Sequence, residues 1–153
     1  MKLELGIKSD PIEYRYSFPW LFDLMSDLEV PNLQLGTFFE LYSVDDRFFR
    51  ELRSEAEVRG VRVRSCFTAH RELGGFLSGS PHLEKVAKEC YERLIDIAAI
   101  LGADYVGGNP GAVFRDRLDE KESLVARYVY HMRELSRYAE RWQIRGLTIE
   151  PMS

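Results

Sequence analysis

Hydrophobic and polar positions divide the chain into short strand-like runs that alternate with longer helix-like runs. Apolar residues that are continuous or alternate over a few positions predict strands, and apolar residues at steps of three and four predict helices. The predicted strands cover residues 3–8, 33–36, 61–67, 104–108 and 147–150. Strands and helices that alternate with short connections predict a parallel sheet with right-handed crossovers.

Four helices are predicted between these strands, with recognisable signals at their ends. The first covers residues 17–29, and the second begins near Ser43 and stops at Gly60. The third begins at a Ser-Pro pair, residues 80 and 81, with serine as the N-cap and proline as the first helical residue. The fourth opens with the capping-box spacing Asp119-x-x-Glu122. The expected apolar stripes are Leu83, Val86, Cys90, Leu94, Ile97 and Leu101 in the third helix, and Val125, Tyr128, Met132, Leu135, Ala139 and Trp142 in the fourth.

Two architectures fit this order of elements. A five-stranded, flavodoxin-like doubly wound sheet matches the length but normally closes with a fifth helix. A (β/α)8 barrel of the TIM type needs roughly 250 residues, so the chain would form about four βα units and the fifth strand. The last strand has no covering helix, and Arg62 and Arg64 in the third strand would need partners that a small complete domain does not offer. We therefore expect residues 1–153 to be a single α/β domain, but periodicity alone does not decide between the two architectures.

Composition excludes several classes of protein. The chain is 45% hydrophobic and 30% charged, which is typical of a soluble globular protein, and its net charge of −4 favours neither nucleic acid nor an anionic membrane as partner. No apolar run is long enough to span a bilayer, and dinucleotide-binding and P-loop motifs are absent from the sequence. Cys66 and Cys90 are isolated and are interpreted as reduced core residues, which favours the cytoplasm.

Candidate functional residues follow the predicted strands, because ligands bind at the carboxyl ends of strands in both architectures. Glu40 follows the second strand, His70 the third and Asn109 the fourth, and Glu150 ends the fifth. We expect these side chains to face a common rim, where Phe38 could form one wall of a sugar pocket.

Each candidate also has a purely structural interpretation. His70 lies in a loop where a histidine can simply be solvated, and Asn109-Pro110-Gly111 has the composition of a turn. Glu150 ends an apolar strand, so its carboxylate needs a metal, a substrate hydroxyl or a basic residue as partner, and we favour the metal. His82 and His131 lie on predicted helices and are interpreted as surface or packing residues.

Three segments give the chain a family likeness. They are the motif CFTAH at residues 66–70 with the Ser-Pro helix start that follows it, the run IAAILGADYVGGNPG at 97–111, and GLTIEPM at 146–152. In this order they resemble the N-terminal half of the xylose isomerase-like (β/α)8 barrel superfamily. This family resemblance favours the truncated N-terminal portion of a TIM barrel. That superfamily includes sugar and sugar-phosphate isomerases, ketose epimerases and DNA repair enzymes of the endonuclease IV type.

The resemblance implies a sugar or sugar-phosphate isomerase or epimerase that transfers a proton next to a carbonyl through an enediolate. It implies that Glu150 binds a divalent ion (Mn²⁺, Mg²⁺, Co²⁺ or Zn²⁺) and can act as acid or base. The other metal ligands would come from strands six to eight, which this sequence does not contain. His70 and Asn109 would contact substrate oxygens, and Glu40 is a weaker candidate for the same rim.

Two other functions remain open. The chain could be a small, non-catalytic α/β binding module. It could also be an endonuclease IV-like nuclease, because His70 matches the histidine that follows the third strand there. Asn109 stands where that branch has its next histidine, which together with the negative net charge counts against nucleic acid. The expected partner is a small sugar rather than nucleic acid or membrane, and open strand edges would favour homo-oligomers.

Overall fold

The computed structural model describes residues 4–12, 15–36, 42–68 and 71–150. Its strands are β1 (Gly6–Lys8), β2 (Asn32–Gly36), β3 (Arg62–Thr68), β4 (Tyr105–Gly108) and β5 (Gly146–Ile149). The α-helices are α1 (Phe18–Asp27), α2 (Asp46–Val58), α3 (Pro81–Leu101) and α4 (Lys121–Glu140), joined by the 3-10 helices η2 (Arg71–Leu77) and η3 (Arg115–Glu120). No helix within these ranges is both long and apolar enough to cross a membrane.

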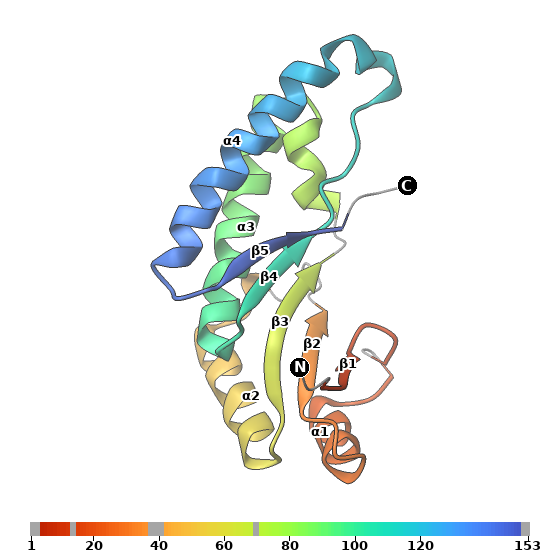
Figure 1. The fold of residues 1–153 in the computed structure, drawn as a ribbon, viewed down its shortest axis with the longest axis vertical. Coiled ribbons are helices and arrows are strands. Elements are labelled where there is room, and N and C mark those ends of the chain that lie inside the picture. Colours follow the sequence, from red (N-terminus) through yellow and green to blue (C-terminus); the bar gives the residue numbers. More distant parts are fainter. Residues whose placement is uncertain (1–3, 13–14, 37–41, 69–70, 151–153) are drawn as a thin grey trace.

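All five strands are parallel and lie in the order β1-β2-β3-β4-β5. In Figure 1 the sheet is strongly twisted, and α2, α3 and α4 lie along one side of it. A flavodoxin-like sheet has the order 2-1-3-4-5, so that alternative is wrong. A sheet whose strands follow the chain order is the wall of a barrel, as predicted.

The core lies between the sheet and the helices. Leu33 and Leu35 of β2 and Val63 and Cys66 of β3 turn toward the helices and are almost fully buried. The pairing of β2 with β3 shifts by one residue at this level, which makes room for Arg64 as an extra residue in β3. Because of this shift, Val63 and Cys66 share one face of the sheet although they are three residues apart.

Arg64 finds a charged partner inside the chain. Its Nη1 lies 2.5 Å from Oδ2 of Asp104, and Oδ1 of the same carboxylate lies 3.0 Å from Nε of Arg145. Arg62 is exposed to solvent. The expectation that the arginines of β3 need partners from outside this domain is therefore wrong for Arg64.

Most predicted helix ends are confirmed. Ser17 and Ser80 cap α1 and α3 by accepting hydrogen bonds from the backbone N–H groups of Trp20 and Leu83. Gly102 ends α3 at φ +73°, a left-handed conformation that glycine adopts without steric cost.

The predicted capping box of the fourth helix is wrong. Residues 115–120 form η3, and α4 begins only at Lys121, without a side-chain cap. The carboxylate of Glu120 instead receives two hydrogen bonds from Arg117, with Oε1 2.8 Å from Nε and Oε2 2.7 Å from Nη2. This local ion pair stabilises the tighter 3-10 turn before the helix.

Parts of the predicted apolar stripes are also wrong, because the helices are rotated relative to the expected faces. Leu83 and Val86 of α3 and Val125 of α4 are 40–49% exposed, and Trp142 lies exposed beyond α4. The buried positions are Ala87, Tyr91, Leu94, Ile95, Ile97, Ala98 and Leu101 in α3, and Leu124, Met132, Leu135 and Ala139 in α4. The first turns of α3 extend past the sheet and pack against η2, where a Cβ on Gly75 would lie 2.4 Å from the carbonyl oxygen of Leu83.

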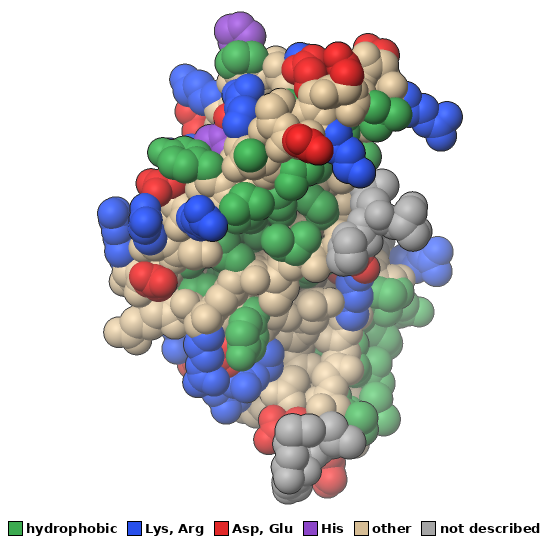
Figure 2. Space-filling view, turned by 45° about the horizontal axis from the view of Figure 1, so that its top comes forward, with side chains coloured by type: hydrophobic (Ala, Val, Ile, Leu, Met, Phe, Trp, Pro, Cys, Tyr) green, Lys and Arg blue, Asp and Glu red, His purple; other side chains and the backbone are tan. Residues whose placement is uncertain are grey.

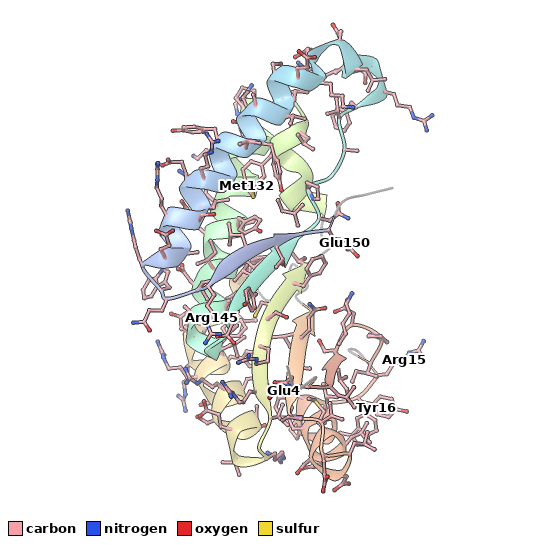
Figure 3. All side chains as sticks on the ribbon, in the orientation of Figure 1. Glu4, Arg15, Tyr16, Met132, Arg145 and Glu150 are labelled. Atoms are coloured by element: carbon pink, nitrogen blue, oxygen red, sulfur yellow. The ribbon has the colours of Figure 1, made fainter. Side chains whose placement is uncertain are left out.

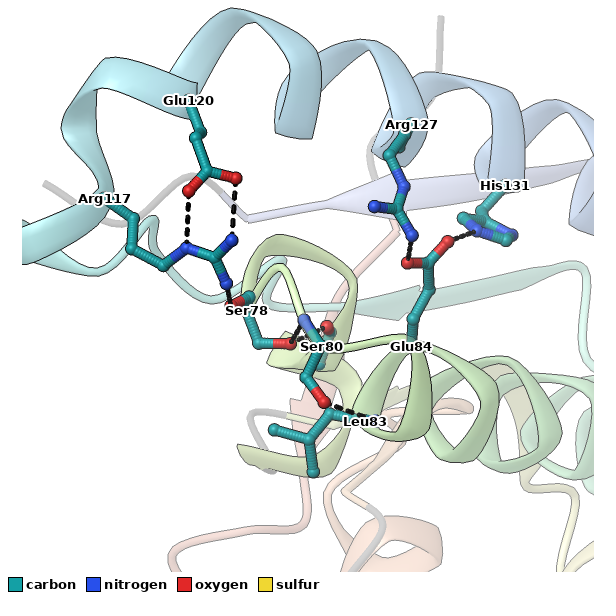
Figure 4. A network of polar contacts seen from close by, with 9 residues as sticks. Ser78, Ser80, Leu83, Glu84, Arg117, Glu120, Arg127 and His131 are labelled. Atoms are coloured by element: carbon teal, nitrogen blue, oxygen red, sulfur yellow. Dashed lines mark hydrogen bonds and ion pairs between the residues drawn. The ribbon is translucent and has the colours of Figure 1, made fainter.

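A largely buried carboxylate joins α3 to α4 (Figure 4). One oxygen of Glu84 is bound to Arg127 and the other to Nε2 of His131, both on α4. The ring of Phe76 from η2 lies 5.0 Å from the imidazole of His131. His131 is therefore a packing residue between two helices, as predicted, whereas His82 is exposed on α3.

Buried acidic groups predict that the protein loses stability in alkali. Burial raises the pKa of the Cys66 thiol to about 12, and that of the Tyr128 hydroxyl to about 12. The pKa of a cysteine thiol in an unfolded chain is about 8.5. The unfolded chain therefore releases its proton first, so the stabilisation is complete below about pH 8.5 and is lost as the pH rises toward 12. A fully buried group such as Cys66 contributes about 1.4 kcal/mol per pH unit to this loss.

We expect the urea midpoint to fall between pH 8 and pH 11, and the fall to be smaller in Cys66→Ala, which lacks the buried thiol. Intrinsic fluorescence at fixed urea steps measures the midpoints of the wild type and of Cys66→Ala. A midpoint that stays constant over this range, or an equal fall in the variant, would contradict the assigned burial of the thiol.

Candidate functional site

The site is built on the carboxyl edge of the sheet, where all parallel strands end. Just past the strands, the N–H groups of Ser9, Asn109 and Glu150 donate to carbonyl oxygens of Gln34, Thr68 and Gly108, at N···O distances of 3.0, 3.2 and 3.3 Å. These hydrogen bonds extend the pairing of β1, β4 and β5 with their neighbours by one residue. They hold Ser9, Asn109 and Glu150 at the same edge of the sheet. Figure 3 shows Glu150 at this edge and Arg145 at the opposite end of β5.

Glu150 and Asn109 are the two predicted site residues that the described ranges contain, and they follow neighbouring strands. Glu150 is exposed. Asn109 is half-buried, and its Oδ1 accepts a hydrogen bond from the N–H of Gly111 at 3.0 Å. Gly111 has φ +71°. The turn interpretation of Asn109-Pro110-Gly111 is thus confirmed, and the amide Nδ2 is the end of Asn109 that a substrate oxygen could contact.

His70, Glu40 and Phe38 lie outside the described residues, so their placement at the rim stays a prediction. The elements that flank them are described. β2 and β3 end at Gly36 and Thr68 on the same edge as Glu150. Gly74 of η2 lies against Gly111, and a Cβ added to Gly111 would lie 2.6 Å from Cα of Gly74. The segment after β3 and the turn after β4 therefore lie side by side.

Three further residues at this edge, Lys8, Asp10 and Phe67, lie at strand ends in the sequence but were not among the predicted site residues. Nζ of Lys8, the last residue of β1, lies 2.7 Å from Oδ2 of Asp10 and 5.5 Å from the ring centroid of Phe67 on β3. The hydrogen bond to Asp10 raises the pKa of Lys8, and the negative charges of Asp10 and Glu150 add to this, while burial lowers it. Their position at the carboxyl end of a strand is the signal that could have identified Lys8 and Asp10.

The floor below these groups is formed by one rung of the sheet, in which Gly36, Phe67, Gly107 and Thr148 stand in register. Phe67 lies between the two glycines and is 9% exposed. A Cβ on Gly107 would lie 2.8 Å from Cδ2 of Phe67 and 2.0 Å from Oγ1 of Thr148. Because residue 107 is a glycine, the ring of Phe67 and the side chain of Thr148 can occupy the space where its side chain would be.

Gly107→Ala is therefore expected to destabilise the protein by about 1–3 kcal/mol, because the methyl group overpacks this rung. Gly146→Ala on the neighbouring strand is the matched control, since its Cβ would meet nothing nearer than 3.8 Å. Urea denaturation of both variants measures the difference. Equal midpoints for the two would show that the rung is not packed as described.

A divalent metal is the cofactor that the sequence suggested, and the described residues can be tested for it. Among residues 4–12, 15–36, 42–68 and 71–150 no three His, Cys, Asp or Glu side chains are grouped so that they could hold an ion. A hard divalent cation wants about six oxygen donors. Glu150 fits the role of a single exposed ligand, but these residues by themselves do not form a metal site.

Comparisons with known proteins identify the fold. No family model matches the sequence, and no curated protein does. Solved structures do match, among them D-psicose 3-epimerase of Clostridium cellulolyticum H10 with D-tagatose, at a TM-score of 0.78 and 19% identity over 93% of this chain and 50% of the epimerase. A protein of Rhodospirillum rubrum ATCC 11170 assigned as a xylose isomerase matches at a TM-score of 0.84 and 20% identity, over 99% of this chain and 55% of that one.

A third match is the IolI protein with a bound zinc atom, at a TM-score of 0.77 and 14% identity over 98% of this chain and 52% of IolI. The chain thus spans about half the length of the solved structures it matches. At these identities the likeness establishes the fold. The described strands and helices have the arrangement of the first half of a TIM barrel, as the sequence motifs predicted.

Proposed function

We propose that this chain is the N-terminal half of a divalent-metal-dependent sugar or sugar-phosphate isomerase or epimerase. The observation that carries the proposal is the position of Glu150, an exposed carboxylate just past the fifth strand, on the edge where barrel enzymes bind their ligands. The matched structures support the choice of substrate, since one is a ketose epimerase solved with a ketose. Reduced Cys66 and Cys90 support a cytoplasmic protein.

In this proposal Glu150 contributes one metal ligand and holds or accepts the proton that moves next to the sugar carbonyl. The metal would polarise the carbonyl and the adjacent hydroxyl of the sugar. The amide of Asn109 donates a hydrogen bond to a sugar oxygen from the neighbouring strand. His70, Glu40 and Phe38 complete the rim as sugar contacts.

The test is an assay of the protein at its natural length. Ketoses, among them D-fructose and D-tagatose, and their phosphates are incubated in parallel with Mn²⁺, Mg²⁺, Co²⁺ or Zn²⁺, in D₂O. Interconversion of epimers or of ketose and aldose, with deuterium incorporated at the carbon next to the carbonyl, supports the proposal. A protein that leaves every sugar unchanged and undeuterated with all four metals would refute it.

A further inference from the structure

Lys8 stands at the mouth of the proposed site without a role in the function proposed above. It ends β1, one edge strand of the sheet, whereas Glu150 follows β5, the other edge strand. The Lys8 side chain is 47% exposed, so its ammonium group is open to the edge where a ligand would bind.

Two contacts fix this ammonium group. Oδ2 of Asp10 lies 2.7 Å from Nζ, and the Phe67 ring centroid lies 5.5 Å away. Oδ1 of Asp10 is buried and accepts no hydrogen bond from the described residues, so Lys8 is the cation that compensates this carboxylate. An ammonium group has three N–H donors, and Asp10 takes one of them. Among the described residues no other hydrogen-bond acceptor of Lys8 is found, so its remaining donors could serve a ligand.

A purely structural role explains this arrangement poorly. An ion pair between two side chains that are 47% and 36% exposed adds little stability. A binding role explains why the Lys8 ammonium group is held between the Phe67 ring and the carboxyl edge of the sheet, where a ligand would bind. The negative charge of Glu150 also raises the pKa of Lys8, although less than Asp10 does.

We propose that Lys8 is a substrate-binding residue of this site, and that Asp10 is the positioning residue that holds its ammonium group toward the sugar. Lys8 donates a hydrogen bond to a sugar oxygen on the β1 side of the mouth, while Glu150 acts from the β5 side. This deepens the proposed function and rests on it. The oxygen could belong to a hydroxyl group or to a phosphate, and the test separates the two.

The first test uses steady-state kinetics of Lys8→Met in the natural-length protein, with D-fructose and D-fructose 6-phosphate as substrates. Loss of a charged hydrogen bond should raise KM about tenfold or more. A rise for both sugars identifies a hydroxyl or carbonyl contact, and a rise for the phosphate alone identifies a phosphate contact. Lys8→Arg should recover part of the affinity. Lys85→Met, an exposed residue of α3, is the matched control and should keep the wild-type KM.

The second test does not need turnover. Natural-length protein labelled with ¹³C at the lysine Cε keeps its ammonium groups intact, and the Lys8 signal is the one that Lys8→Arg lacks. Addition of D-fructose or its 6-phosphate should shift this signal and leave that of Lys85 in place. Asp10→Asn should lower the pKa of Lys8 and weaken the shift.

The outcomes separate this inference from the proposed function. Turnover by the wild type with an unchanged KM in Lys8→Met refutes the role of Lys8 and leaves the function standing. No turnover of any sugar refutes the function, and an unmoved Lys8 signal with both sugars then refutes the binding role as well. A shift without turnover keeps Lys8 as a ligand contact. Circular dichroism and urea midpoints of Lys8→Met and Lys8→Arg show that neither effect comes from unfolding.

Discussion

Replacement of Glu150 by glutamine is expected to lower kcat of the natural-length protein by about 10²–10⁴-fold in saturating metal. Glutamine has nearly the same shape but cannot accept the proton, and general acid–base catalysis contributes a factor of this size. The side chain is exposed at the end of β5, so the change removes no buried contact and the fold should persist. Epimer or aldose formation, followed by NMR at several substrate concentrations, separates kcat from KM.

Glu89→Gln is the matched control for this variant. Glu89 is an exposed carboxylate of α3 in a loose pair with Lys85, at an N···O distance of 3.7 Å. Its loss should change neither kcat nor the urea midpoint measurably. Glu150→Gln with more than half of the wild-type kcat would show that Glu150 does not transfer the proton.

Residues 1–153 produced alone are expected to have no isomerase activity and to bind catalytic metal weakly. One exposed carboxylate supplies too few of the roughly six donors that a hard divalent cation needs. The described residues contain no group of three His, Cys, Asp or Glu side chains that could supply the missing donors. Elemental analysis for manganese after incubation with Mn²⁺ and desalting measures retention, and sugar turnover is followed in parallel.

The same polypeptide with Glu150→Gln serves as the baseline, since its manganese content gives the non-specific level. Stoichiometric manganese in residues 1–153, well above that level, would refute the prediction.

Light scattering of the same sample measures whether the isolated polypeptide self-associates. Val125 and Val129 of α4 and Ile149 of β5 are 40–48% exposed, and Figure 2 shows hydrophobic side chains gathered on one face of the molecule. Such exposure favours self-association of the isolated polypeptide.

Local signals were sufficient to predict most of the fold. Ser80 and Gly102 bound α3 as expected, because capping and left-handed turns depend on a few neighbouring atoms. Strand order could not be obtained from the hydrophobic pattern, which fits a doubly wound sheet equally well. The family motifs favoured the barrel, and the structure confirmed it through the pairing of consecutive strands.

The errors arose where contacts distant in sequence decide the outcome. Val125 fits a helical stripe in α4, but packing against α3 and η2 buries Leu124 instead. The capping-box spacing at Asp119 was overridden by the ion pair of Arg117 with Glu120. The position of Lys8 at the end of a strand was visible in the sequence, but its contact with the Phe67 ring depends on strand pairing across β2.

Crystals of the natural-length protein soaked in Mn²⁺ test the proposed role of Glu150 most directly. Anomalous scattering at the manganese edge locates the ion independently of any assay. We predict an ion bound to a carboxylate oxygen of Glu150 at about 2.2 Å, at the carboxyl edge of the sheet and on the same side as Lys8 and Asn109. A fully occupied manganese ion elsewhere, with Glu150 uncoordinated, would contradict the role proposed for this residue.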